Sequence, residues 1–141
     1  MADAHSYLHF NGNCEEAFNL YRTVFGGDFS LISRYGDMPT DPPVPLEEEK
    51  KIMHISLPLQ KGSVLLGSDI PAGFPKGVRG NSYYISINTE SAEEARKVYA
   101  GLTDGGQIFM PLEKTFWASL FGMFSDQYGV QWMVSYNEPQ Q

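Results

Sequence analysis

The residues best suited to acid–base chemistry in this chain are one histidine and one aspartate. His54 lies within the apolar stretch IMHISLPLQ, and Asp69 ends the next such stretch, SVLLGSD, after a short turn. A carboxylate that holds an imidazole can orient it as a general base, because an imidazole exchanges protons near neutral pH. The alternative, which we favour, is a structural hydrogen bond that pins a hairpin. His54 and Asp69 are therefore candidate catalytic residues with both roles left open.

Histidines could also hold a metal ion. Side chains of the types that bind divalent transition metals occur at four places on expected strands: His5, His9, His54 and Asp69. Their separations in sequence say nothing about whether they meet, and a single histidine on a strand is more often hydrogen-bonded than metal-bound. We therefore expect no metal and no other cofactor. A divalent metal at His5 and His9 is the disfavoured alternative.

Aromatic residues are dense towards the C-terminal end, at Phe116, Trp117, Phe121, Phe124 and Trp132. Alternation in VQWMV predicts that Trp132 packs beneath a helix while Met133 faces the opposite side. Trp117 fits three roles: core packing, dimer packing, or an aromatic wall against a planar or apolar ligand, since pockets are commonly lined by such rings.

These residues must be positioned by strands and helices, and the pattern of those elements occurs twice. CEEAFNLYRTVFGG at 14–27 is echoed by AEEARKVYAGLTDGG at 92–106, and both combine helical spacing of apolar residues with a glycine stop. Asn13 stands where the N-cap of the first helix is expected. Helices are predicted at 14–25 and 91–103. Strands are predicted at 6–10, 29–35, 52–60, 63–69, 83–88, 107–113 and 130–136, and 115–126 is predicted as a strand or a strand with a bend.

Each half therefore reads as a strand, a helix and three further strands. We predict an α+β fold of two βαβββ modules, at about 5–70 and 80–137, within a single domain spanning 1–141. The modules are expected side by side, forming a curved mixed sheet with the helices on the outer face and a concavity on the other.

The charge balance excludes two classes of partner. The chain has 17 acidic and 10 basic residues and a net charge of -7, so we expect neither nucleic acid nor membrane as a partner. No apolar run approaches the roughly 18 residues of a membrane span. The single cysteine, Cys14, cannot form an intramolecular disulfide and has no evident catalytic partner. We expect a cytoplasmic protein.

Several segments resemble those of a known family, and they occur in the same order along the chain. They are YLHFNGNCEEAFNLYRTVFGG at 7–27, RYGDMP at 34–39, IMHISL at 52–57, GSD at 67–69 and TFWASLFGMFSDQYGVQWM at 115–133. The sequence resembles the PhnB-like branch of the vicinal oxygen chelate superfamily, which includes glyoxalase I, extradiol dioxygenases and bleomycin-resistance proteins. The resemblance implies the paired-module fold with a ligand cleft. Some PhnB-like sequences are labelled ubiquinone methyltransferases, but this chain lacks a Gly-rich strand-to-helix turn for a nucleotide-type cofactor.

The resemblance also implies where a metal would be bound, because metal-using members take ligands from the first and fourth strands of each module. The fourth-strand positions here fall at about Leu66 and at Met133, and neither side chain suits such an ion. The first strand of the second module offers Ser82 or Tyr84. Only the first strand of the chain keeps candidates, in His5 or His9.

We therefore predict a metal-independent protein that binds a small molecule in the cleft. The expected ligand-binding residues are Tyr7, His9, Tyr84, Phe116, Trp117 and Met133. The alternative is a small-metabolite enzyme, a lyase, isomerase or dioxygenase-like protein, that uses His54 as base or a non-standard metal site.

Two further expectations concern a long loop and assembly. Gly36–Lys51 holds four prolines and the run EEEKK, and we expect it to close over the ligand as a lid with Glu47–Glu49 in water. The resemblance, together with apolar residues at 116–124, implies a homodimer.

Overall fold

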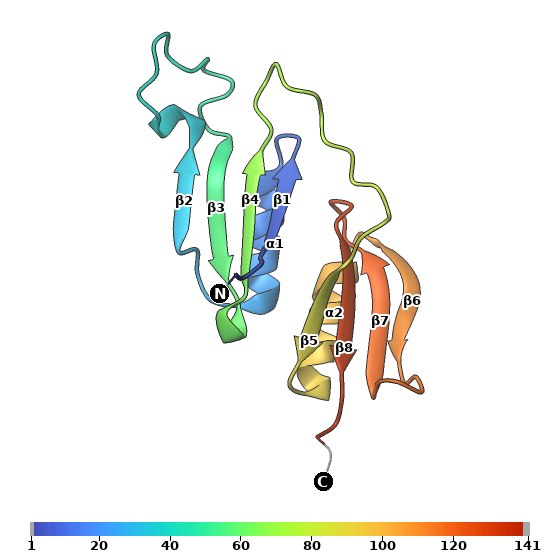
Figure 1. Cartoon of the computed structure of the whole chain (residues 1–141). Helices are drawn as coiled ribbons and strands as arrows, with labels where there is room; N and C mark the ends of the chain where they lie inside the picture. Colours follow the sequence, from blue (N-terminus) through green and yellow to red (C-terminus); the bar gives the residue numbers. More distant parts are fainter. Residues whose placement is uncertain (1, 140–141) are drawn as a thin grey trace. The chain divides into compact units, whose positions relative to one another are not determined.

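The chain is built of two compact units, Met1–Val78 and Arg79–Gln141. The computed structural model describes residues 2–139. Each unit contains a strand, an α-helix and three further strands in that order (Figure 1). The predicted pair of βαβββ modules and the α+β class are therefore confirmed. Among the described residues, no helix is long and apolar enough to cross a membrane.

Unit 1 is a four-stranded mixed sheet with one helix on one face. Its elements are β1 Ser6–Phe10, α1 Cys14–Phe25, β2 Leu31–Arg34, β3 Ile52–Pro58 and β4 Val64–Asp69, with short 3-10 helices η1 Tyr35–Asp37 and η2 Gln60–Gly62. The strand order is β1-β4-β3-β2. Strands β1 and β4 run parallel, and the other neighbours run antiparallel.

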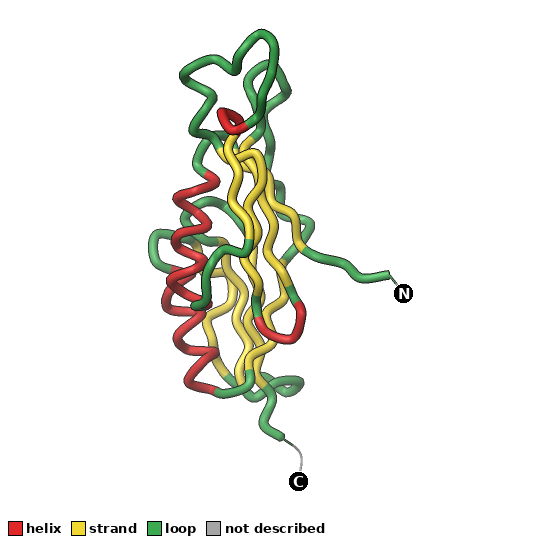
Figure 2. Tube along the Cα trace, turned by 90° about the vertical axis from the view of Figure 1, so that its left-hand side faces the viewer, coloured by secondary structure: helices red, strands yellow, loops and turns green. Residues whose placement is uncertain are grey.

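Unit 2 repeats this topology. Its elements are β5 Ile85–Thr89, α2 Ala92–Thr103, β6 Gln107–Glu113, β7 Leu120–Ser125 and β8 Gln131–Tyr136, in the order β5-β8-β7-β6. Strands β5 and β8 are the parallel pair. In each unit the helix runs along one face of its own sheet (Figure 2), so the opposite face carries no helix of that unit.

The core of unit 1 lies between α1 and the sheet. The buried helix side chains recur every three or four residues, at Ala17, Phe18, Tyr21 and Val24. They meet the buried strand residues Leu8, Phe10, Ile55, Leu57 and Leu65. A Cβ on Gly67 would lie only 2.5 Å from Phe18 Cε1, so this close approach of helix and strand requires glycine.

The core of unit 2 is built in the same way beneath α2. Trp132, Val134 and Phe124 are completely buried, and the ring of Tyr99 packs edge-on against Phe124 at 5.6 Å. Burying a large apolar side chain stabilises a fold by roughly 1.5–3 kcal/mol. The prediction that Trp132 packs beneath the helix is therefore confirmed.

The two helices begin differently despite their similar sequences. In α2, Ser91 accepts a hydrogen bond from the Glu94 N–H, and the Glu94 carboxylate accepts one from the Glu90 N–H. In α1, Asn13 occupies the N-cap position but its side chain makes no capping hydrogen bond. The expected side-chain cap is thus absent there, and another residue takes its place.

Of the two predictions for 115–126, a strand or a strand with a bend, the structure agrees with the second, because β7 begins only at Leu120. Residues 115–118 instead form a turn: the Thr115 N–H donates to the Ala118 carbonyl, and the Ala118 N–H donates to Thr115 Oγ1. A threonine side chain can satisfy turn backbone in this way, which competes with strand pairing.

Candidate functional site

The face of unit 1 opposite α1 gathers the polar residues of its strands. Pairing across the sheet places side chains of matched residues on the same face. We call this the helix-free face of unit 1, formed by Tyr7, His9, Leu31, Ser33, His54, Ser56, Leu66 and Ser68. Their neighbours along each strand, such as Leu8 and Ile55, point into the core. Residues Tyr7 to Phe10 therefore alternate between the two faces of the sheet.

Three rings form a cluster on this face. The Tyr7 hydroxyl lies 3.2 Å from His54 Nδ1, within hydrogen-bonding distance. The ring centroid of Tyr7 is 5.7 Å from that of His54 and 5.2 Å from that of His9. Because His9 pairs with Ser68 on β4, and β3 lies on the other side of β4, the imidazoles flank the buried Ser68. The Tyr7 ring thus contacts both imidazoles.

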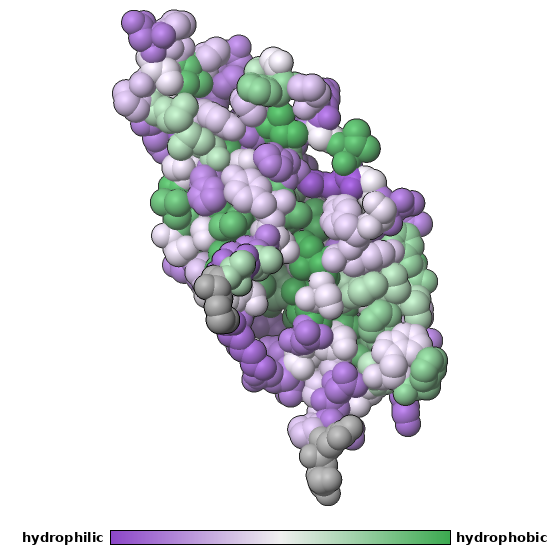
Figure 3. Space-filling model, in the orientation of Figure 1, coloured by the Kyte–Doolittle hydropathy of each residue, from purple (hydrophilic) through white to green (hydrophobic). Residues whose placement is uncertain are grey.

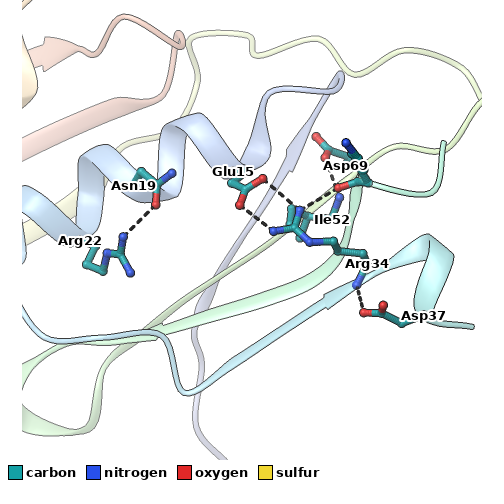
Figure 4. Close-up of polar contacts among 8 residues, drawn as sticks. Glu15, Asn19, Arg22, Arg34, Asp37, Ile52 and Asp69 are labelled. Atoms are coloured by element: carbon teal, nitrogen blue, oxygen red, sulfur yellow. Dashed lines mark hydrogen bonds and ion pairs between the residues drawn. The ribbon is translucent and has the colours of Figure 1, made fainter. Parts of the chain in front are cut away.

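Asp69 does not orient His54, contrary to one of the two predicted roles. Its Oδ1 accepts hydrogen bonds from the N–H groups of Gly12 and Cys14, both at 3.0 Å, and its Oδ2 accepts one from Ile52 at 2.8 Å. Asp69 is paired with Phe10, so its side chain points to the helix side, whereas His54 points to the opposite side. The carboxylate caps helix α1 from a distant strand and fixes the start of β3 (Figure 4).

The four side chains of the alternative metal set do not all share a face of the sheet. His9 and His54 lie on the helix-free face, Asp69 lies beneath the sheet, and His5 precedes β1 and contacts Asp3 at 3.2 Å. Within residues 2–139, no three His, Cys, Asp or Glu side chains are arranged to hold a metal ion.

Strand pairing shows which residues lie beside the fourth-strand positions that the resemblance implies. Leu66 pairs with Tyr7 in unit 1. In unit 2 Met133 pairs with Ser86, not with Ser82 or Tyr84, because β5 begins only at Ile85. Hydroxyl, thioether and aliphatic groups at these places are poor ligands for a divalent transition metal.

The face of the unit 2 sheet opposite α2, which we call the helix-free face of unit 2, is apolar over β6 and β7. It includes Ser86 and Asn88 on β5, Gln131, Met133 and Ser135 on β8, Phe121 and Met123 on β7, and Met110 on β6. Met133 is half-buried and faces away from α2, as predicted. Apolar colours gather over β6 and β7 in Figure 3. Tyr84 precedes β5 and is half-buried, so its expected place on a strand is not observed.

The aromatic residues before β7 are exposed. Phe116 is 97% exposed and Trp117 is 50% exposed. Their ring centroids lie 4.8 Å apart, and Trp117 also packs edge-on against Phe121 at 5.4 Å. Trp117 is therefore no core residue of unit 2. Its two remaining roles are ligand contact and assembly.

The long loop is fastened at its base. The N–H groups of Tyr35 and Gly36 donate to the carbonyls of Lys51 and Glu49. Arg34 makes a forked ion pair with Glu15 of α1, at 3.0 and 2.7 Å (Figure 4). This hydrogen-bonded pairing lowers the pKa of the Glu15 carboxyl.

The glutamate run in this loop is not fully solvated, and that expectation is corrected. Glu48 is buried, pairs with Lys51 Nζ at 2.6 Å and accepts a hydrogen bond from the Ala72 N–H at 2.7 Å. The Lys51 contact, followed by the Ala72 bond, lowers the pKa of Glu48. Glu48 therefore joins the long loop to the segment after β4.

Comparisons with known proteins agree with this architecture. Residues 2–135 match the model of a family described as 3-demethylubiquinone-9 3-methyltransferase. Protein PA1353 from Pseudomonas aeruginosa is 38% identical with a TM-score of 0.85, over 99% of this chain and 100% of that one. The PhnB protein from Bacillus cereus is 27% identical with a TM-score of 0.73, over 96% and 99%.

A more distant structure shows the same fold. A glyoxylase/bleomycin resistance protein/dioxygenase domain from Frankia sp. EAN1pec is 13% identical with a TM-score of 0.66, over 98% of each chain. The predicted glyoxalase-like fold is therefore confirmed.

Proposed function

We propose a function from one premise: the chain belongs to the PhnB-like branch of the vicinal oxygen chelate superfamily, in the family described as 3-demethylubiquinone-9 3-methyltransferase. The protein binds a small organic molecule on the helix-free face of unit 1, and this binding needs no metal.

The observation that carries this proposal is the ring cluster of Tyr7, His9 and His54. The Tyr7 side chain lies on a sheet face, yet 43% of the residue stays exposed, while its ring contacts both imidazoles. Aromatic and imidazole rings stack well on planar ligands, and their polar atoms orient a bound molecule. A structural role alone does not require three rings to converge on an exposed face.

Metal independence is supported by the donor chemistry at the family positions. The implied fourth-strand positions hold Leu66 and Met133, and the residues paired with them are Tyr7 and Ser86. A divalent metal site needs several imidazole, carboxylate or thiolate ligands together. We therefore assign the ligand contacts to rings and hydroxyls.

We do not assign the methyl transfer that the family description names. The turn from β1 to α1 is where a nucleotide-type cofactor would need free backbone N–H groups and a Gly-rich sequence. Here the N–H groups of Gly12 and Cys14 donate to Asp69. The Asn11 carboxamide exchanges two hydrogen bonds with the backbone of Gly77. The turn is thus engaged by the protein itself.

A second candidate function is favoured by the contact between Tyr7 and His54. In the tautomer whose Nδ1–H donates to the Tyr7 hydroxyl oxygen, Nε2 of His54 is unprotonated, has no hydrogen-bond partner among residues 2–139, and could accept a proton from a bound substrate. In this alternative His54 is the base of a small-metabolite enzyme, and Tyr7 replaces Asp69 as the residue that orients it.

The proposal extends to assembly and location. A homodimer is supported by the exposed Phe116 and Trp117, whose rings contact each other, because contiguous exposed apolar patches often mark interfaces. A cytoplasmic location is supported by the single, buried Cys14. Sedimentation equilibrium at micromolar concentration should show a dimer that Phe116→Ala weakens, and a monomeric wild type would exclude it.

The test of binding uses the isotope-labelled protein of residues 1–141 and a set of small aromatic probes, including phenol, indole and 2-naphthol. We expect probes to shift the NMR signals of Tyr7, His9 and His54, and Tyr7→Ala to abolish these shifts. Phe74→Ala is the matched control, since Phe74 is an exposed aromatic residue of unit 1 outside the sheet. Shifts confined to other surfaces, or unchanged in Tyr7→Ala, would refute the proposal.

Metal independence is tested on the same samples. Binding should persist unchanged after dialysis against a strong chelator, and elemental analysis should find no stoichiometric Zn, Ni, Mn or Fe. A stoichiometric metal lost in a His5→Ala, His9→Ala double variant would overturn this part of the proposal.

A further inference from the structure

The helix-free face of unit 1 has an unusual charge composition. The chain carries 17 acidic and 10 basic residues. The described strands of unit 1 nevertheless place no carboxylate, ammonium or guanidinium group on this face. The charged side chains at the strand ends point elsewhere: Asp69 binds backbone at the start of α1, and Arg34 binds Glu15 of α1.

The polar groups that remain are able both to donate and to accept hydrogen bonds. Hydroxyls and neutral imidazoles each offer a donor and an acceptor. On this face they are arranged in a row across the sheet, His9 to Ser68 to His54 to Ser33, with the Tyr7 hydroxyl above it at His54 Nδ1. Such a row can pair with the carbonyl, hydroxyl or amide of a neutral molecule.

Charged molecules are disfavoured for two separate reasons. A cation would lose hydration without gaining a carboxylate, and an anion would lose hydration without gaining a fixed positive charge. The net charge of -7 also repels anions at long range. A flat, uncharged ring meets neither penalty and can stack against Tyr7.

We infer that this face selects an uncharged, planar molecule bearing a hydroxyl, carbonyl or amide group. The inference rests on the proposed binding function and narrows its ligand to one chemical class. It adds the charge of the ligand, which the ring cluster of Tyr7, His9 and His54 alone does not determine.

Three probes of nearly the same shape separate the possibilities: benzamide, benzoate and benzamidinium share one ring and a planar head group but differ in charge. Each is titrated into the isotope-labelled full chain at pH 7.5 while the Tyr7, His9 and His54 signals are followed. We expect benzamide to bind at least about tenfold more tightly than either ion, since an unpaired charge costs more than this factor on burial. Tyr7→Ala should remove the benzamide response, and Phe74→Ala should keep it.

Each outcome has a distinct meaning. Equal or tighter binding of benzoate or benzamidinium overturns the inference but leaves binding at this face intact. Failure of all three probes, while neutral aromatic probes of the wider set bind here, overturns recognition of the amide head group. Failure of every probe at this face overturns the proposed function itself.

A variant that adds charge gives an independent check. Ser33 pairs with His54 and is only partly buried, so Ser33→Asp places a carboxylate at the end of the polar row. We expect Ser33→Asp to reverse the order, with benzamidinium binding more tightly than benzamide, and Ser33→Asn to keep the wild-type order. An unchanged preference in Ser33→Asp would show that charge at this face does not control selection.

Discussion

Replacing Asp69 tests whether one buried carboxylate starts helix α1. Its three acceptor contacts to Gly12, Cys14 and Ile52 are each 3.0 Å or shorter. In Asp69→Asn, Oδ1 can keep two of them, but the amide NH₂ group then faces the Ile52 N–H. One charge-assisted bond is lost and the others weaken, so we expect a loss of about 2 kcal/mol. Asp69→Ala leaves all three donors without this acceptor and should cost about 3–6 kcal/mol.

The matched control is Asp126, which is also buried and also accepts three N–H groups. They come from Tyr128, Val130 and the indole of Trp132. Both tryptophans of the chain, Trp117 and Trp132, belong to unit 2. Urea unfolding followed by tryptophan fluorescence therefore reports unit 2, whereas circular dichroism reports both helices. Asp69→Asn should lower the free energy of unfolding in the circular dichroism signal, and Asp126→Asn should lower it in fluorescence.

One result would refute this reasoning. The result would be a free energy of unfolding for Asp69→Asn within about 0.5 kcal/mol of the wild-type value, while Asp126→Asn is clearly destabilised. The N–H donors at the start of α1 would then have other acceptors. Loss of about 2 kcal/mol in a unit of this size should instead lower its thermal midpoint by roughly 8–16 °C.

Three further predictions follow from other contacts. Gly67→Ala should destabilise unit 1 by about 1–3 kcal/mol in urea unfolding, because its Cβ would meet Phe18 at 2.5 Å; a neutral effect would contradict this packing. The lowered pKa of Glu15 means that its pairing with Arg34 stabilises the fold above pH about 4 and is lost as the pH falls through the folded-state pKa. Glu15→Gln should therefore flatten the acid limb of stability between pH 5 and about 2, and an unchanged slope would count against it. Replacing residues 41–45 by a Gly-Ser link should leave the thermal midpoint within a few degrees but speed dissociation of a bound probe, whereas unfolding would exclude a lid.

Much of the fold could be predicted because its local signals agree with one another. In α1 and α2 the apolar spacing and the glycine stops give the helix bounds closely, Cys14–Phe25 and Ala92–Thr103. In β8 the alternation predicts the face of each residue clearly. Trp132 shares its face with Val130 and Val134, whereas Met133 points to the other face. Such signals depend only on neighbours in sequence, and they place single residues on the correct face.

The direction of Asp69 could not be read from alternation in its strand. Val64, Leu65 and Leu66 are all apolar, so the pattern does not show which of the two sets of alternate residues faces the helix. The pairing of β2 with β3 shifts where one step from Ser33 to Arg34 matches two steps on β3, from His54 to Ile52. This irregularity breaks the alternation of β3, and Ile52 and Ile55 are both buried although they are three residues apart.

Contacts between residues far apart in the chain could not be predicted from the sequence either. A run of glutamates is usually solvated, and nothing in the sequence marks Glu48 as the one that meets the Ala72 N–H. The forked pair of Arg34 with Glu15 joins residues 19 positions apart. These contacts depend on how the chain closes around unit 1, which local pattern does not encode.

The dependence of α1 on Asp69 links the helix to the proposed ligand-binding face. Phe10, the partner of Asp69, follows His9 directly, and Ile52, which donates to Asp69, precedes His54 by two residues. Asp69 therefore contacts the backbone two residues before His54, from the opposite side of the sheet. In unit 2 the corresponding helix is capped locally by Ser91 and needs no such link. In unit 1 a single carboxylate thus joins the start of α1 to the start of β3 and the end of β4.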